Sequence, residues 1–153
     1  RCLIARRLVE RGVRFVQLFH GNQPWDNHND LATGLPFICR KTDQPSAALV
    51  KDLKQRGMLD STIVHWGGEI GRLPVTENGS GDAAKAGRDH NGQGFSIWMA
   101  GGGIRGGTAY GATDEFGHKA VTNIVTPNDY QATLLHQFGI DHKRLTYKHG
   151  GQE

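Results

Sequence analysis

The spacing of hydrophobic positions along the chain predicts three helices. They cover residues 1–11, 43–58 and 127–138. In each, apolar residues recur at intervals of three and four, which places them on one side of a helix. Asp43 is the expected N-cap of the second helix, and Gly12 and Gly139 follow the first and third as C-terminal stop residues.

Short runs of β-branched and aromatic residues predict strands between these helices. They cover residues 13–19, 61–66 and 95–100, and a further short β segment is expected around 108–112. Helices and strands therefore alternate, which favours an α/β fold with a largely parallel sheet between helices.

The composition excludes several classes of protein. Eighteen Lys and Arg against 15 Asp and Glu leave a net charge of +3, a weak excess that does not indicate a nucleic-acid binder, which would show a clustered basic face. The apolar runs are far shorter than the ~20 residues of a membrane span. Cys2 and Cys39 are too few for a disulfide scaffold. Because the chain begins without Met, inside a predicted helix, we expect it to be part of a longer protein.

Two long loops are the expected location of the chemistry. They cover residues 20–36 and 67–94, and loops longer than ~12–15 residues are usually functional or disordered. Both follow predicted strands, and open α/β sheets bind ligands beyond the carboxyl ends of their strands. The chain also has 22 Gly and 8 His, residue types that suit close backbone approach and metal or acid–base chemistry.

The first loop contains a carboxylate and an imidazole in Asp26 and His28. Residues two apart in an extended segment point to the same side. An Asp with a His is a common ligand pair for Zn²⁺ or Mn²⁺. The alternative is a turn in which Asp26 caps its own backbone and His28 is solvated.

The second loop begins and ends with charged residues beside glycines. Glu69 and Arg72 lie in the glycine-rich run 67–72, directly after a predicted strand. Glu69 is placed to face a crevice, and Arg72 is suited to a phosphate or sulfate oxygen. The alternative is a glycine turn with a surface salt bridge. At the other end, Asp89 is either a ligand or the residue that orients His90, the alternative being a structural Asp–His hydrogen bond.

These motifs, taken in order, resemble a bacterial sulfatase-like family of unknown function, domain of unknown function 1501, which is allied to the alkaline phosphatase and sulfatase superfamily. The matching segments are Trp25–His28, Gly68–Arg72, Gly87–His90, Phe95–Ile104, Thr126–Leu135 and Gly139–Ile140. The similarity extends over nearly the whole chain. It implies an alkaline-phosphatase-like fold, a three-layer sandwich with a largely parallel sheet, of which residues 1–153 form the C-terminal part of one domain.

The resemblance also implies a metal site. Asp26 and His28 correspond to ligands of one metal, Glu69 stands where an Asp-His-Gly motif usually supplies ligands to the other, and His90 is the last His ligand, with Asp89 beside it. The implied cofactor is a divalent metal, Zn²⁺ first, with Mn²⁺, Mg²⁺ and Ca²⁺ as alternatives. The sequence departs from the family pattern in two ways: Asp26 and His28 are unusually close, and Glu-Ile replaces Asp-His.

The function that the resemblance implies is metal-dependent cleavage of a sulfate or phosphate ester, of a small molecule or a glycan. Arg72 and Arg88 would stabilise charge on the transferring group. Superfamily members carry their nucleophile in the N-terminal half, so we expect this chain alone to be inactive. The resemblance also suggests a periplasmic or extracytoplasmic location. The alternatives are a non-catalytic, metal-stabilised binding or structural module, and an inactive fragment.

Overall fold

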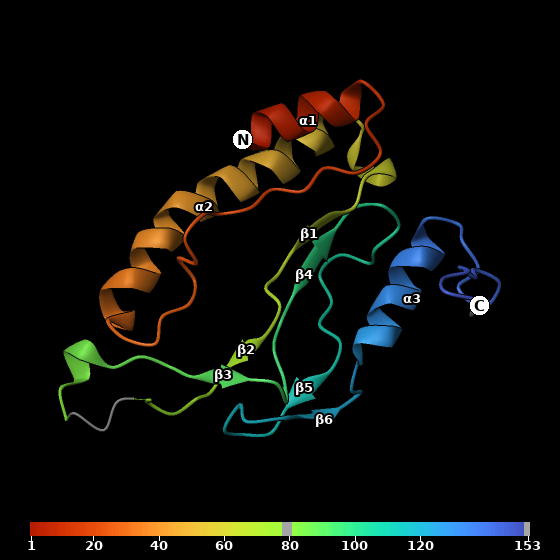
Figure 1. The fold of residues 1–153 in the computed structure, drawn as a ribbon. Helices are drawn as coiled ribbons and strands as arrows, with labels where there is room; N and C mark the ends of the chain where they lie inside the picture. Colours follow the sequence, from red (N-terminus) through yellow and green to blue (C-terminus); the bar gives the residue numbers. More distant parts are fainter. Residues whose placement is uncertain (78–80, 152–153) are drawn as a thin grey trace.

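The computed structural model describes residues 1–77 and 81–151 (Figure 1). Its helices are α1 (Cys2–Glu10), α2 (Leu31–Gln55) and α3 (Pro127–Gln137), with short 3₁₀ turns η1 (Leu59–Ser61) and η2 (Ala83–Lys85). Its strands are β1 (Val64–Trp66), β2 (Gly71–Arg72), β3 (His90–Asn91), β4 (Trp98–Ala100), β5 (Ala112–Thr113) and β6 (Ala120–Thr122). The predicted helices at the two ends of the chain are confirmed.

The helices α1 and α2 lie side by side and contain most of the buried residues (Figure 1). Ala5 on α1 and Leu53 on α2 are buried. Arg6 of α1 is also buried, and its Nε donates to Asp52 Oδ2 of α2 at 2.8 Å. Arg56 donates to the other oxygen of Asp52 at 2.7 Å. Apolar contact and an ion-paired network therefore join the two helices.

The second predicted helix is longer than its hydrophobic pattern indicated. The prediction covered 43–58, whereas α2 begins well before it and continues through Pro36 and Pro45. Each proline removes one helical hydrogen bond, but Ile38 between them is buried, and packing outweighs that local cost. Asp43 is therefore an interior helical residue, and its prediction as the N-cap is wrong.

The predicted parallel sheet, and with it the three-layer alkaline-phosphatase-like sandwich, is wrong. Within residues 1–77 and 81–151 the strands form three two-stranded antiparallel sheets, in the pairs β1–β4, β2–β3 and β5–β6. The architecture is a small mixed α/β arrangement. The predicted strands 61–66 and 95–100 do pair, as β1 and β4, but they run antiparallel and are joined by a loop, so no helical crossover makes them parallel. The local sequence pattern can indicate a strand, but it does not specify the partner strand or whether the two run parallel or antiparallel.

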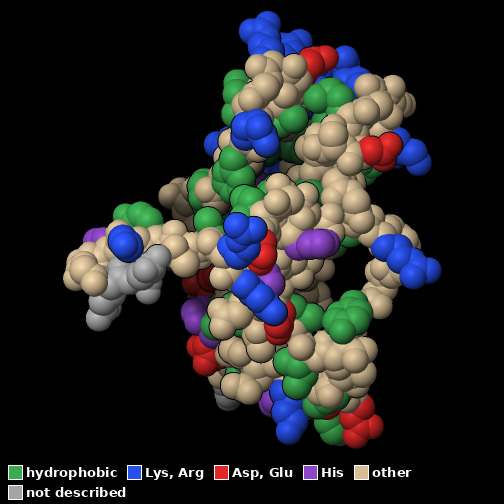
Figure 2. Space-filling view, turned by 90° about the vertical axis from the view of Figure 1, so that its right-hand side faces the viewer, with side chains coloured by type: hydrophobic (Ala, Val, Ile, Leu, Met, Phe, Trp, Pro, Cys, Tyr) green, Lys and Arg blue, Asp and Glu red, His purple; other side chains and the backbone are tan. Residues whose placement is uncertain are grey.

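Residues 13–19, predicted as a strand, have no regular secondary structure and are not part of any sheet within the described residues. Phe15 and Phe19 in this segment are 73% and 68% exposed. The accessible surface of the chain is 11785 Å², whereas a compact monomer of this mass would expose about 7,700 Å². Figure 2 shows hydrophobic side chains in several places on the visible face. Much of the apolar surface is therefore uncovered.

The last helix, α3, begins with strong local signals. The Thr126 side chain accepts a hydrogen bond from the Asp129 N–H, and the Asp129 carboxylate accepts one from the Thr126 N–H. Pro127 follows the cap, as the sequence pattern predicts. None of the described helices is both long enough and apolar enough to cross a bilayer.

Candidate functional site

Two loops, one before α2 and one before β3, dock against each other and build the site. The Arg88 N–H donates to the Asn27 carbonyl at 3.0 Å. Next to it, Gly87 is buried against His28: a Cβ atom at Gly87 would lie 2.0 Å from the carbonyl carbon and oxygen of His28. Only a residue without a side chain permits this backbone approach. The glycine therefore fixes the position of His28.

The short β2–β3 ladder presents a cation and an imidazole to the first loop. Arg72 of β2 lies directly opposite His90 of β3, and opposite residues of an antiparallel pair share one face. Gly71 is buried, and a Cβ atom there would lie 2.2 Å from the Gly94 carbonyl oxygen. The glycine-rich run of the sequence thus allows the close packing that positions Arg72.

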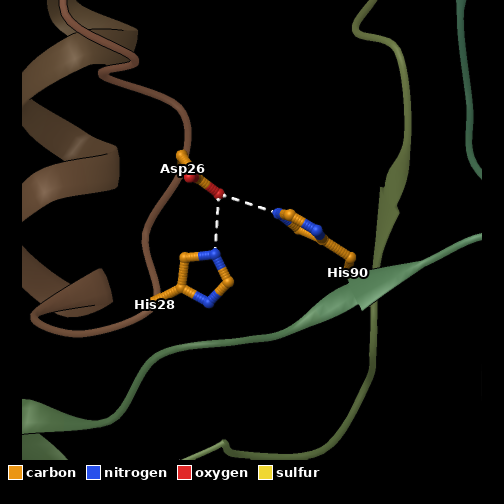
Figure 3. Close-up of side chains that lie close together, drawn as sticks. All are labelled: Asp26, His28 and His90. Atoms are coloured by element: carbon orange, nitrogen blue, oxygen red, sulfur yellow. Dashed lines mark hydrogen bonds and ion pairs between the residues drawn. The ribbon is translucent and has the colours of Figure 1, made fainter.

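A single oxygen of Asp26 lies at the centre of the site (Figure 3). Asp26 Oδ1 accepts a hydrogen bond from Arg72 Nη2 at 2.5 Å, and it lies 3.0 Å from His28 Nε2 and 3.1 Å from His90 Nε2. The hydrogen bond from Arg72, followed by that from His90, lowers the pKa of Asp26 to about 2. The carboxylate is therefore ionised at neutral pH.

The other nitrogen of the His28 ring faces a second pair of carboxylates. His28 Nδ1 lies 2.7 Å from Glu77 Oε2 and 4.0 Å from Asp89 Oδ1. The hydrogen bond with Glu77 raises the pKa of His28 above its ordinary value of 6.5. Sequence reasoning missed Glu77, because it lies within the long second loop without a motif around it.

The residue types and distances fit a metal ion in two overlapping groups. Within the described residues, Asp26, His28 and His90 form one group, and His28, Glu77 and Asp89 form the other. In each group the potential ligand atoms all lie within 4.8 Å of one another. Carboxylate oxygen and imidazole nitrogen are ligands that Zn²⁺ and Mn²⁺ accept. The two groups meet the two ring nitrogens of His28, Nε2 in the first and Nδ1 in the second.

The structure brings most of the predicted ligands together. Those that lie in the two groups are Asp26, His28, Asp89 and His90. Glu69 is exposed and lies in neither group. Of the two predicted anion-stabilising arginines, Arg72 contacts Asp26, whereas Arg88 Nη1 donates to the Leu73 carbonyl at 2.9 Å. Arg88 thus holds the loop, and Arg72 is the arginine that contacts Asp26.

Comparison with known proteins identifies a family for the chain. The family model described as Protein of unknown function (DUF1501) matches residues 1–153. No curated protein and no solved structure matches the chain. Because the family match covers the whole sequence, the chain belongs to this family.

Proposed function

We propose that this member of the DUF1501 family supplies metal-binding residues to a metal-dependent hydrolase of the sulfatase or phosphatase type, with Zn²⁺ as the first candidate ion. The observation that carries the proposal is the convergence of Asp26, His28 and His90 from two separate loops. The two loops are joined by a backbone hydrogen bond and by the close contact at Gly87. The ligand set is therefore built by the tertiary structure.

In ester cleavage, some of these residues would bind the metal and Arg72 would stabilise developing charge. A divalent cation bound here would polarise the ester oxygen and lower the pKa of a nucleophile. The ionised Asp26 and the two imidazoles would hold the cation. The Arg72 guanidinium, 2.5 Å from Asp26 Oδ1, would lie where negative charge develops on the transferring group and would stabilise it.

The large exposed surface supports the view that residues 1–153 act within a larger folded unit. An area of 11785 Å² exceeds that of a compact monomer of this mass by roughly half. Exposed phenylalanines such as Phe15 and Phe19 are suited to burial against further polypeptide. In this proposal the nucleophile comes from outside residues 1–153, so this chain binds the metal but does not turn over ester.

A second candidate function is a non-catalytic polar cluster that joins the two loops. The position of Arg72 favours it, because its guanidinium already occupies Asp26 Oδ1, and a cation bound at the same oxygen would be repelled. In this case the cluster would be complete without a metal. The two candidates differ in whether the chain takes up metal.

Equilibrium dialysis of the chain against Zn²⁺, followed by elemental analysis, tests the proposal. We expect stoichiometric zinc in the unsubstituted chain and at least about tenfold weaker binding in His90→Ala, because a ligand is lost. His142→Ala is the matched control, since His142 lies outside both groups. We also expect no hydrolysis of aryl sulfates or aryl phosphates by residues 1–153. Equal zinc content in all three proteins would contradict the ligand assignment and favour the polar cluster.

A further inference from the structure

The three tryptophans of the chain gather at one place. The rings of Trp25 and Trp66 are in edge-to-face contact, with centroids 5.7 Å apart and planes at 82°. Trp98 of β4 is the direct antiparallel partner of Trp66 of β1, and directly opposite residues share one face of a sheet. The three indoles therefore belong to one aromatic surface, which we call the aromatic subsite.

The aromatic subsite is open to solvent and held in position. Trp66 and Trp98 are 39% and 38% exposed, although tryptophan is usually well buried. The Trp25 indole N–H donates to His20 Nδ1 at 3.3 Å, and the two rings meet edge-on at 6.0 Å. Since Trp25 is already oriented by these contacts, a ligand that binds there orders few side chains.

Two backbone connections bring the aromatic subsite to the Asp26 cluster. Trp25 directly precedes Asp26 in the sequence. Trp66 ends β1, and the chain then continues through residues 67–71 to Arg72, which donates to Asp26 Oδ1. Because Trp25 and Asp26 are consecutive residues, the aromatic subsite borders the Asp26 cluster.

We propose that Trp25, Trp66 and Trp98 bind the alcohol part of the ester and select alcohols that contain a ring with a flat apolar face. This inference rests on the proposed function, because the Asp26 cluster and Arg72 must take the anionic group. Indoles interact well with flat apolar faces through stacking and edge contacts. Aryl rings and sugar rings share that chemistry, whereas a short acyclic alkyl group lacks it.

Calorimetric titration of the zinc-loaded chain with three probes tests the aromatic subsite. The probes are phenyl phosphate, glucose 6-phosphate and ethyl phosphate. We expect at least one ring ester to bind roughly two- to tenfold more tightly than ethyl phosphate. In Trp66→Leu this preference is lost while ethyl phosphate binds as before. Phe116→Leu, which replaces an aromatic side chain that is 68% exposed between β5 and β6, is the matched control and keeps the preference.

The outcomes separate the two ring types and separate this inference from the proposed function. A preference for phenyl phosphate alone supports an aryl alcohol, and one for glucose 6-phosphate alone supports a sugar. Equal binding of all three probes overturns the aromatic subsite, as does a preference that survives in both Trp66→Leu and Trp98→Leu. Equal binding of the three probes by a zinc-loaded chain overturns the subsite alone, whereas loss of zinc binding, or zinc binding without any phosphate binding, overturns the proposed function with it.

Discussion

The helical pair and the Asp26 cluster are stabilised in opposite ways. In the α1–α2 pair, Leu53 is 2% exposed and the guanidinium of Arg6 is buried against Asp52. In the Asp26 cluster, the side chains of Asp26 and His90 are 29% and 47% exposed. The stabilisation from apolar burial changes little with small displacements of the side chains. The interactions within a cluster of partly exposed charged groups depend on the exact positions of the atoms and on their protonation. We therefore expect the stability of the helical pair to fall when buried side-chain volume is removed. We expect zinc binding by the cluster to depend on the positions of its ligand atoms and on pH.

The largest effect on stability is expected from Leu53→Ala. Removing a buried leucine side chain leaves a cavity and costs roughly 2–5 kcal/mol of unfolding free energy. Leu35→Ala is the matched control, because Leu35 is on the same helix but is 38% exposed, and it should cost less than about 1 kcal/mol. Denaturant unfolding followed by helical circular dichroism measures both. Similar costs for the two variants would show that burial does not dominate the helical pair.

A smaller and more local effect is expected from Gly87→Ala. The new methyl group would lie 2.0 Å from the His28 carbonyl, so the two loops must separate. We expect zinc affinity to fall by about tenfold or more, as for changes that displace metal ligands, while the helical unfolding transition stays in place. At Gly92 a Cβ atom meets nothing within 4 Å, so Gly92→Ala is the control. Unchanged zinc binding in Gly87→Ala would mean that the loop contact does not position His28.

The same contrast explains what the sequence could predict. The helices α1 and α3 follow from local periodicity and from stop or capping residues such as Gly12 and Thr126. The antiparallel pairing of β1 with β4, and the lack of a strand partner for residues 13–19 within the described part of the chain, depend on contacts between distant segments, which local pattern does not encode. Residues 13–19 were predicted as a strand, and that prediction is wrong because a strand exists only with a partner.

The candidate site was predictable only in part, for the same reason. Asp26, His28 and His90 belong to short motifs of carboxylate and imidazole, which can be recognised one by one. Their convergence, however, depends on how the loops dock. Glu77, which lies 2.7 Å from His28, has no motif around it, and its role follows only from the path of the second loop. The hydrogen bond from Arg72 to Asp26 also required the structure, because the two residues lie far apart in the sequence.

The smallest expected effect is a shift in the pH dependence of zinc binding. Glu77 raises the pKa of His28 above 6.5, and a metal ligand must be the neutral imidazole. Zinc should therefore dissociate as the pH falls through this raised pKa, at a higher pH than for an ordinary histidine. For a cation held by Asp26, His28 and His90, Glu77→Gln removes only the charge that raises the pKa of His28, so the midpoint of zinc release should move to lower pH. Loss of zinc binding at every pH would instead show that Glu77 is itself a ligand. Glu115→Gln, in the turn between β5 and β6, is the control.

In the metal-free chain, the stability of the loops should depend on pH in the opposite direction to zinc binding. Because the pKa of His28 is raised on folding, its ion pair with Glu77 stabilises the loops fully below pH 6.5, and this stabilisation is lost as the pH rises through the raised value. Helices α1 and α2 contain no histidine. Between pH 6 and 8, the protection of the loop amides, measured as the exchange rate relative to the intrinsic rate at each pH, should fall as the pH rises, while the protection of the α2 amides changes less. An equal response in both regions would contradict the separation of the helical pair from the Asp26 cluster.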